Sequence, residues 1–398
     1  MSRGELRLVC EAPNGAEAGD VLLAVPRSAL LIEPRVPPPG APQLPWEVRL
    51  ALRLLDAAMG QDDSPGAQLW AAYAGALLPA PESLAQPSCL SAVQLAELQE
   101  GSEADGAAAR GLAQQERLKE MMPMLVGEPG AGGCGPLQWS LACVRSRGFA
   151  CNARGGGFRS ATTAAEGEDE RGAPDDEFAL VPFLDCANHA DSEGELNADF
   201  AFEALPGDID GDIAPNFLAG PGEQAASDGE GEEGFVLRAT KPIAQGEEIR
   251  IQYHDGMDNK RMLACYGYSV EGNPLDRVPL MLPPAAASAV RAAAQAAEEK
   301  ARAAGEEADA RRAAAVAASV VEAGADGPDT EGCLLELLLA LLEDIRDLPT
   351  SADDDAAMLA AAPLSPPLRA AVAYRLERKR LAGVVAEVLQ AAAAAATE

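Results

Sequence analysis

The hydrophobic pattern of the chain predicts several short β-strands. Residues 6–10 and 21–25 are strand-like pieces separated by a turn that contains asparagine and glycine. Residues 235–239 are apolar, and residues 248–253 alternate between apolar and polar side chains after a Gln-Gly turn. The apolar face of the alternating segment carries Ile249, Ile251 and Tyr253. We expect these segments to form the β part of the fold.

The same pattern predicts helices in the N-terminal half. Residues 48–59 and 137–150 carry apolar side chains at helical spacing. A further helix contains Trp70 and Tyr73 and ends before Pro79, because proline restricts the residue that precedes it. Strands and helices are therefore mixed along this part of the chain.

A short helix is predicted just after the alternating segment. Asp258 is suited to cap its first turn, and Gly267 is suited to follow its last turn. Tyr266 lies immediately before that glycine. Since Tyr253 ends a strand and Tyr266 ends a helix, we expect the two tyrosines to converge on one place.

The C-terminal part of the chain has a purely helical pattern. Residues 285–323 are alanine-rich and are broken by Gly305, and residues 333–345 are strongly apolar. Ser365 and Pro366 are suited to begin a last helix whose apolar stripe must pack against neighbours. No period recurs, so we expect a separate helical domain and not a repeat protein.

Two segments, residues 153–177 and 206–234, have no apolar periodicity. Both are rich in glycine and acidic residues. Because they flank the predicted strands, we expect them to be surface loop insertions inside one domain.

Composition narrows the classes of function. The chain has 398 residues, of which 48% are hydrophobic and 4% aromatic, so it is long enough for two domains or one large domain. The formal net charge of −32 argues against binding to nucleic acid or to an anionic membrane, because both depend on basic surface. A basic partner would be attracted.

Cysteine and histidine usage argues against a metal site and a disulfide framework. The eight cysteines never form Cys-x-x-Cys, and the chain has only two histidines. No secretory signal or transit peptide is visible, and no apolar run is long enough to cross a bilayer. We therefore expect a soluble intracellular protein with reduced thiols.

The candidate chemistry depends on few polar residues. Residues 178–200 begin as an apolar run and continue into Asn188 and His189, where a buried strand would otherwise end. With Tyr253 and Tyr266, these residues suit a site that positions a reactive cofactor and contributes no nucleophile. A Ser-His-Asp triad lacks a spare histidine, and the cysteines lack a plausible partner. Taken singly, each residue also fits an ordinary role as a turn residue or a core aromatic.

Four short motifs follow one another in a specific order. They are RSRGF at 145–149, VPFLDCANH at 181–189, GEEIRIQY at 246–253 and CYGY at 265–268. In order and spacing they resemble the SET-domain protein methyltransferases, specifically the Rubisco large-subunit lysine N-methyltransferase type. The resemblance extends over nearly the whole chain.

The resemblance implies an α+β fold in two domains. Residues 1–280 would form a β-rich SET domain with a pseudoknot-like crossing, a departure from the usual unthreaded topology. A helical insert at about residues 46–135 and the two loop insertions would interrupt it. Residues 283–398 would form an all-helical substrate-binding domain.

The resemblance also implies an activity. S-adenosylmethionine would be the cofactor, and its methyl group would pass in line to the deprotonated amine of a lysine in a non-histone protein. The Rubisco large subunit or another protein substrate is the implied partner, for a monomer in the chloroplast or the cytoplasm. Two alternatives stay open: methylation of a protein histidine by the same fold, and a decayed SET core that acts as a protein-binding module.

Carrying the motifs over residue by residue assigns roles within the site. Tyr253 matches the catalytic tyrosine. The implied cofactor-binding residues are Gly4, Glu5, Leu6, Arg147, Asn188, His189 and Tyr268. The implied residues of the substrate channel are Asp185, Phe200 and Tyr266. No metal is implied.

Two residues depart from the family pattern. Arg7 stands where the N-terminal cofactor segment usually has a glycine, and Phe200 stands where a channel tyrosine is common. Without that hydroxyl the channel would be less polar, and we expect this to change the number of methyl groups added.

Overall fold

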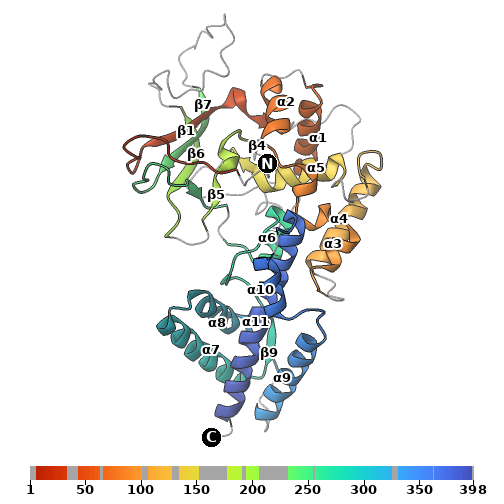
Figure 1. Cartoon of the computed structure of the whole chain (residues 1–398), viewed down its shortest axis with the longest axis vertical. Coiled ribbons are helices and arrows are strands. Elements are labelled where there is room, and N and C mark those ends of the chain that lie inside the picture. The colour runs from red at the N-terminus through yellow and green to blue at the C-terminus, as the bar shows by residue number, and fades with distance from the viewer. Residues whose placement is uncertain are drawn as a thin grey trace, which may run out of the picture. The chain divides into compact units, whose positions relative to one another are not determined.

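The computed structural model consists of two compact units. It describes residues 6–33, 44–62, 66–100, 106–127, 134–151, 177–190, 194–205, 232–253, 256–324, 330–361 and 363–396. The first unit comprises Met1–Pro79 and Pro136–Asp255, and the second comprises Ala80–Gly135 and Gly256–Glu398. The predicted helical insert is thus divided between the two units (Figure 1). The predicted domain limits, 1–280 and 283–398, stay a prediction.

Short sheets form the β part of the first unit. One antiparallel sheet has the strand order β1 (Val21–Pro26), β7 (Glu233–Ala239), β6 (Ala198–Ala204). A second antiparallel sheet has the order β2 (Leu31–Ile32), β4 (Phe178–Leu180), β3 (Gly148–Ala150). A parallel pair joins β5 (Asn188–His189) to β8 (Arg250–Ile251). The strands predicted at 21–25 and 235–239 are confirmed.

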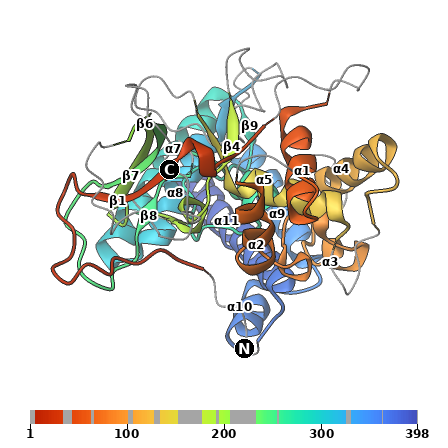
Figure 2. The same cartoon turned by 90° about the horizontal axis from the view of Figure 1, so that it is seen from above.

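Helices pack beside these sheets in the first unit. They are α1 (Trp46–Ala58), α2 (Ala67–Ala76) and α5 (Pro136–Arg147), with the short 3₁₀ turns η1 (Arg27–Ala29) and η4 (Leu184–Cys186). Helix α1 lies against α5, as both views show (Figure 2). The Trp46 ring stacks on Phe178 with centroids 3.9 Å apart, and the Trp70 indole donates to the Ala29 carbonyl at 3.0 Å. These contacts fix α1 to the second sheet and α2 to the turn η1 that precedes β2.

The strand predicted at residues 248–253 is shorter than expected. Its regular part is β8 alone, and the Asn197 side chain makes two of the hydrogen bonds to the backbone at residues 248 and 250. The Asn197 amide oxygen accepts the Arg250 N–H at 2.8 Å, and its amide nitrogen donates to the Glu248 carbonyl at 2.9 Å. The expected alternation survives, since Ile249 and Ile251 are buried.

Two further expectations for the first unit need correction. Residues 6–10 do not form a strand; they make an isolated bridge between Val9 and Glu248, flanked by separate backbone hydrogen bonds. The helix predicted at 137–150 ends at Arg147, because residues 148–150 extend and pair with β4 as β3.

The second unit is mostly helical. Its α-helices are α3 (Ala92–Ala96), α4 (Ala107–Met121), α6 (Asn259–Tyr266), α7 (Pro284–Ala304), α8 (Glu307–Ser319), α9 (Thr330–Arg346), α10 (Ala352–Ala361) and α11 (Pro366–Ala396). It also contains the 3₁₀ turns η2 (Pro81–Ser83) and η3 (Pro87–Cys89). Helices α7, α8 and α9 lie against the long α11 (Figure 1). Their core includes Val290, Val316, Leu334 and Val385.

Helix ends in the second unit match the local sequence. The Asp258 carboxylate accepts the Arg261 N–H at 2.8 Å, so it caps α6 as predicted. Gly267 and Gly305 follow α6 and α7 in the left-handed region, with φ of +79° and +78°. Left-handed backbone costs other L-residues about 1–2 kcal/mol, so glycine is the natural choice there.

The prediction of helix alone after residue 283 is wrong at one place. Strand β10 (Val320–Glu322) pairs in parallel with β9 (Leu280–Leu282). Val320 and Val321 begin this strand, and β-branched side chains favour extended backbone. The pairing ties the end of α8 to the segment that precedes α7.

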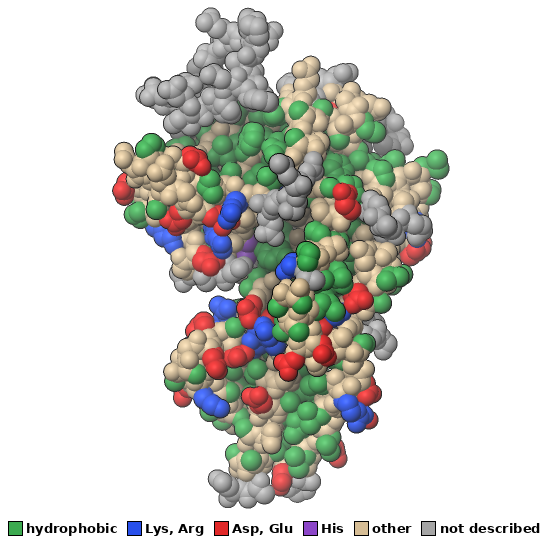
Figure 3. Space-filling model, in the orientation of Figure 1, with side chains coloured by type: hydrophobic (Ala, Val, Ile, Leu, Met, Phe, Trp, Pro, Cys, Tyr) green, Lys and Arg blue, Asp and Glu red, His purple; other side chains and the backbone are tan. Residues whose placement is uncertain are grey.

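Charges on the second unit are locally compensated. The face shown in Figure 3 carries acidic and basic side chains close to one another. Arg291 pairs with Glu322 at 2.6 Å, and Arg302 pairs with Glu298 at 2.7 Å. Such exposed pairs contribute little to stability, about 0–1 kcal/mol each. No helix in the described ranges has the length and apolar character needed to span a membrane.

Candidate functional site

The parallel pairing of β5 and β8 brings two of the sequence motifs together. Asn188 is paired with Arg250, and His189 is paired with Ile251. The Ala190 N–H continues the ladder by donating to the Ile251 carbonyl at 3.0 Å. The motif at 181–189 therefore lies beside the motif at 246–253, as expected for the crossing.

Tyr253 and His189 are in direct contact in this arrangement. The Tyr253 N–H donates to His189 Nδ1 at 3.1 Å, and the two ring centroids are 5.2 Å apart. The Tyr253 hydroxyl donates to the Ala187 carbonyl at 2.7 Å. The hydroxyl is thus held at the start of the segment that carries Asn188 and His189.

The environment of His189 keeps its ring neutral. Burial lowers the pKa of His189 to about 4, although the negative charge of Glu195 opposes this shift. Because Nδ1 accepts the Tyr253 N–H, the remaining ring proton is on Nε2. His189 is therefore not a proton carrier near neutral pH.

A second cluster joins Arg147, Asp185 and Tyr73. Arg147 Nη1 donates to the Asp185 carbonyl at 2.6 Å and to its Oδ2 at 3.2 Å. The Tyr73 hydroxyl donates to Asp185 Oδ1 and accepts the Phe183 N–H at 2.9 Å. The Asp185 side chain is 1% exposed. Arg147 and Asp185, which the motifs assign to different roles, are direct partners.

Phe183 shows that this cluster holds the backbone under strain. Its φ is +69°, in the left-handed region that bulky residues avoid. The Tyr73 hydroxyl binds its N–H, and the two rings pack edge to face with centroids 5.5 Å apart. The strained turn sets the direction in which the chain enters Asp185.

The pKa values of this cluster follow from burial and from the Asp185 charge. Burial and Asp185 hold the pKa of Tyr73 well above its ordinary value, so the hydroxyl stays protonated. Burial lowers the pKa of Arg147, but the charge of Asp185 together with smaller contributions from Cys143, Cys186 and Tyr253 outweighs burial, and the net shift is upward. Burial and Asp185 also raise the pKa of Cys186 to about 11. A thiol with that pKa is a poor nucleophile at neutral pH.

Phe200 lies on β6 within the aromatic core of the first unit. Its ring packs edge to face on Phe149 with centroids 5.1 Å apart, and it lies 6.1 Å from Phe235. The Phe200 ring therefore packs against two other aromatic rings, with no hydroxyl group involved. Its predicted role in a substrate channel stays a prediction.

The N-terminal segment is only partly described. Gly4 and Glu5 lie outside the described residues, and Leu6 is 42% exposed. Beyond Leu6, the Leu8 carbonyl accepts the Ile249 N–H at 2.9 Å, and the Cys10 N–H donates to the Glu247 carbonyl at 2.9 Å. The segment therefore runs beside the strand that pairs with Asn188 and His189.

Tyr266 and Tyr268 belong to the second unit. Their ring centroids are 6.2 Å apart, on either side of Gly267. The predicted convergence of Tyr253 and Tyr266 stays a prediction, because the two residues lie in different units.

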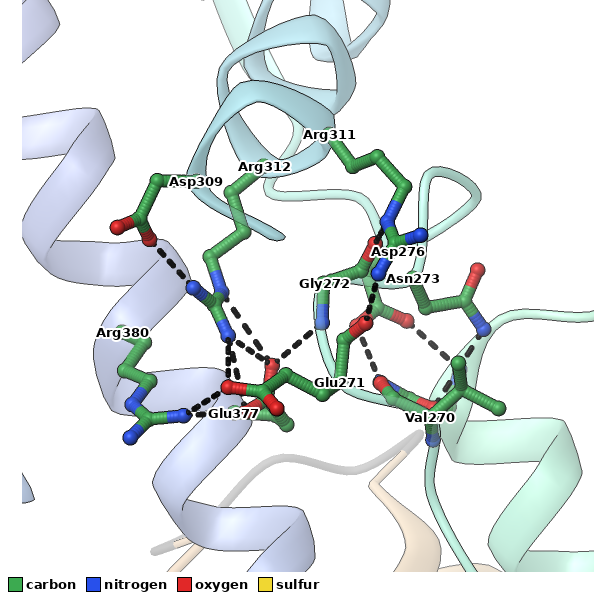
Figure 4. Close-up of polar contacts among 11 residues, drawn as sticks. Val270, Glu271, Gly272, Asn273, Asp276, Asp309, Arg311, Arg312, Glu377 and Arg380 are labelled. Atoms are coloured by element: carbon green, nitrogen blue, oxygen red, sulfur yellow. Dashed lines mark hydrogen bonds and ion pairs between the residues drawn. The ribbon is translucent and has the colours of Figure 1, made fainter. Parts of the chain in front are cut away.

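The loop that follows these tyrosines is anchored at both sides (Figure 4). On one side the Asn259 amide donates to the Asp276 carboxylate at 2.7 Å and to the Val270 carbonyl at 2.9 Å. On the other side the Gly272 N–H donates to Glu377 of α11 at 2.9 Å. Burial raises the pKa of Asp276 to about 6, against the hydrogen bonds from Asn259.

The sequence did not single out three residues that hold this site together. Tyr73 was expected only as part of a helix, although it binds Asp185. Asn197 supports the strand at Arg250, and Glu248 accepts a hydrogen bond from Asn188 at 2.6 Å. Glu248 lies within the motif at 246–253, so its position in the sequence could have suggested a role in the site. Tyr73 and Asn197 lie outside the four motifs, and nothing in the sequence pointed to them.

The polar groups of the first unit suit an amino-acid-like ligand. Arg147 uses Nη1 on Asp185, and its other guanidinium N–H groups remain to bind a carboxylate. Asn188 offers an amide oxygen in the paired motif, because its amide nitrogen faces Glu248. Among the described residues, no group of three or more His, Cys, Asp or Glu is placed to hold a metal ion.

Comparison with known proteins identifies the fold class. No family model and no curated protein sequence matches the chain. A solved SET domain of LSMT bound to lysine and AdoHcy matches with a TM-score of 0.52 and 15% identity, over 98% of this chain and 88% of that chain. The same protein bound to methyl-lysine and AdoHcy matches with a TM-score of 0.54 and 14% identity, over 98% and 88%. The chain therefore has a SET-domain fold.

Within that class the likeness is to the LSMT type. Rubisco LSMT bound to AdoMet matches with a TM-score of 0.50 and 14% identity, again over 98% of this chain and 88% of that chain. The predicted α+β fold class and the predicted SET-domain resemblance of the LSMT type are both confirmed.

Proposed function

We propose that this protein is an S-adenosylmethionine-dependent protein-lysine N-methyltransferase that acts on a non-histone protein. The observation that carries the proposal is the parallel pairing of β5 with β8. It places the Tyr253 hydroxyl, donating to the Ala187 carbonyl at 2.7 Å, at the segment that carries Asn188 and His189. Solved structures of the same fold have AdoMet, AdoHcy or lysine bound, which supports the same ligands here.

The chain's own groups supply the contacts that the cofactor needs. The free guanidinium edge of Arg147 would bind the cofactor carboxylate, and the Asn188 amide would bind its amino-acid end. The His189 backbone and the segment that includes Leu6 would add further contacts. When bound, the cofactor supplies a methyl group on a positively charged sulfur, which is already a good leaving group.

Tyr253 would orient the attacking amine. A lysine has an ordinary pKa of about 10.4, so it must lose a proton before its nitrogen can attack. Apolar walls and the nearby positive sulfur would favour the neutral amine. The rate gain then comes mainly from holding the nitrogen in line with the methyl carbon, which is a gain in proximity and orientation. The Ala187 carbonyl and the Tyr253 hydroxyl are hydrogen-bonded to each other, so both would be available to the amine in a fixed position.

The test is a labelling experiment with a matched control. A soluble proteome is incubated with methyl-labelled S-adenosylmethionine and with wild-type protein, Tyr253→Phe, or Tyr374→Phe. Tyr374 is a buried tyrosine of the second unit whose hydroxyl binds Glu100 at 2.7 Å, so Tyr374→Phe removes a buried hydroxyl that belongs to the other unit. We expect a discrete labelled protein with wild type and Tyr374→Phe, and a loss of label with Tyr253→Phe.

Site mapping of the labelled protein separates the alternatives. Label on lysine supports the proposal, whereas label on histidine would assign the chain to protein-histidine methylation. Calorimetry on the unlabelled protein gives an independent answer. No heat with S-adenosylmethionine, together with no labelled protein, would mean a decayed core that serves as a binding module.

A further inference from the structure

We propose that Glu248 is a positioning residue that fixes the side-chain amide of Asn188, so that Asn188 presents its oxygen to the ammonium group of the bound cofactor. The Asn188 amide nitrogen donates to Glu248 Oε1 at 2.6 Å. The proposal rests on the proposed function for the identity of the ligand. The orientation of the amide rests on the geometry alone.

The chemistry of the pair decides which end of the amide faces Glu248. An ionised carboxylate only accepts hydrogen bonds, whereas an amide has one donating and one accepting end. Nδ2 must therefore face Glu248, and Oδ1 must face away from it. Without the carboxylate, the amide can turn by 180° about its last bond and present a donor in place of the acceptor.

The surroundings of Glu248 keep it ionised and in place. Arg250 Nη2 donates to Glu248 Oε2 at 3.0 Å, so each carboxylate oxygen has its own partner. Burial raises the pKa of Glu248, but the hydrogen bonds from Asn188 and Arg250 and the charges of Arg250 and Arg7 outweigh it, and the pKa lies below its ordinary value. The Glu248 side chain is 18% exposed.

The backbone around Glu248 is equally fixed. The Glu248 carbonyl accepts the Asn197 amide at 2.9 Å, and Val9 bridges to Glu248 from the N-terminal segment. Asn188 is itself held by its pairing with Arg250. The paired backbones therefore bring the donor and the acceptor close together, and the hydrogen bond to Glu248 decides which end of the Asn188 amide faces the carboxylate.

This arrangement gives Arg7 a physical role. Arg7 departs from the glycine that the family usually has, and its positive charge acts on Glu248. A carboxylate that is balanced by Arg7 and Arg250 can stay ionised beside the amide. An amide oxygen backed by that negative charge attracts an ammonium group and repels a carboxylate.

The experiment compares Glu248→Gln and Glu248→Ala with Glu195→Gln. Glu195 is a matched control because it binds the same Arg250, at 2.7 Å, through Nη1, whereas Glu248 binds Nη2. The first readout is the NMR signal of the Asn188 side-chain amide in protein without ligand, assigned with Asn188→Ala. In wild type and in Glu195→Gln, we expect one Asn188 side-chain amide proton to resonate downfield, because it is hydrogen-bonded to the Glu248 carboxylate. In both Glu248 variants, we expect the signal of this proton to move upfield.

The second readout is calorimetric binding of two ligands. S-adenosylmethionine carries the ammonium group, and 5′-methylthioadenosine lacks the whole amino-acid end. A hydrogen bond to a charged group predicts a loss of about tenfold to hundredfold in S-adenosylmethionine affinity for Glu248→Ala, with methylthioadenosine affinity unchanged. Glu195→Gln should keep both affinities.

Each contrary result has its own meaning. An amide signal that does not move in Glu248→Ala overturns the orienting role. Equal losses for both ligands overturn it too, because they show general damage to the pocket. If wild type binds no S-adenosylmethionine, the proposed function and the ammonium assignment both fail, and the NMR shift still decides whether Glu248 orients Asn188.

Discussion

Tyr73 and Asp185 lie 112 residues apart in the chain and share a buried hydrogen bond. The same carboxylate binds Arg147 through Oδ2 at 3.2 Å. One acidic side chain thus connects a helix of the first unit with the end of α5 and with the segment that leads to Asn188. The position of Arg147 in the candidate site depends on this connection.

Removal of the Tyr73 hydroxyl should weaken this connection measurably. Tyr73→Phe loses the bond to Asp185 and leaves the Phe183 N–H without its acceptor. We expect the free energy of unfolding to fall by about 1–3 kcal/mol, as measured by urea unfolding. In a double-mutant cycle with Asp185→Asn, the two changes should not add, with a coupling of about 0.5–3 kcal/mol. Simple additivity would mean that the hydroxyl and the carboxylate do not interact.

His189 should titrate far below an ordinary histidine. The pKa is about 4 in the folded protein and 6.5 in the reference state, so the folded state binds fewer protons between these values. The contribution of His189 to stability is therefore full above about pH 6.5 and is lost as pH falls toward about 4.

NMR titration of the histidine ring protons checks this directly, because the chain has only two histidines. One of the two signals should have a midpoint near pH 4 and should be absent from His189→Asn. Asparagine can keep an acceptor for the Tyr253 N–H without titrating. Two signals that both titrate near pH 6.5 would contradict the buried, neutral ring.

Gly272 should tolerate alanine much less well than Gly305. Both have left-handed backbone, with φ of +59° and +78°, so both substitutions cost about 1–2 kcal/mol in strain. A Cβ at Gly272 would lie 2.6 Å from the Ala308 carbonyl oxygen, whereas a Cβ at Gly305 has nothing within 4 Å. Thermal unfolding should therefore show a larger loss of stability for Gly272→Ala. Equal losses would mean that the loop shown in Figure 4 shifts freely to make room.

Asp355 should be among the most sensitive positions of the second unit. It is 0% exposed and accepts Arg375 Nε at 2.9 Å and Lys379 Nζ at 2.6 Å. Asp355→Asn would remove the ion-pair partner of the buried Lys379 and leave Arg375 with Glu97 as its remaining carboxylate, at a cost of about 3–5 kcal/mol. Chemical unfolding measures the loss.

An exposed ion pair provides the control for Asp355. Glu343 and Arg346 form a pair at 3.2 Å on α9, and their side chains are 68% and 70% exposed. Glu343→Gln should change the free energy of unfolding by no more than about 0.5 kcal/mol. A similar loss in both variants would show that burial does not decide the strength of these pairs.

Local signals in the sequence located the elements well. Asp258 and Gly267 mark the ends of α6, and Gly305 ends α7, because caps and left-handed turns depend on the residue itself. The strand at 248–253 was overestimated, since alternation says nothing about whether a neighbouring backbone is present. Asn197 makes two of the hydrogen bonds there through its side chain.

The candidate site also combines features that the sequence predicted with contacts that it did not. Asn188, His189 and Tyr253 could be predicted from motif order, and the pairing of β5 with β8 brings them together. The contacts of Arg147 with Asp185 and of Asn188 with Glu248 could not be predicted, because hydrogen bonds between distant segments leave no periodic trace in the chain.

The sequence by itself determined the capped ends of α6 and α7, the apolar faces and the order of the motifs, because each depends on residues that are neighbours along the chain. Only the tertiary structure decided that Tyr73 binds Asp185 and that Glu248 binds the amide of Asn188. Those contacts arise when distant strands and helices are packed into one core, where a buried polar group must find its partner wherever the fold places one.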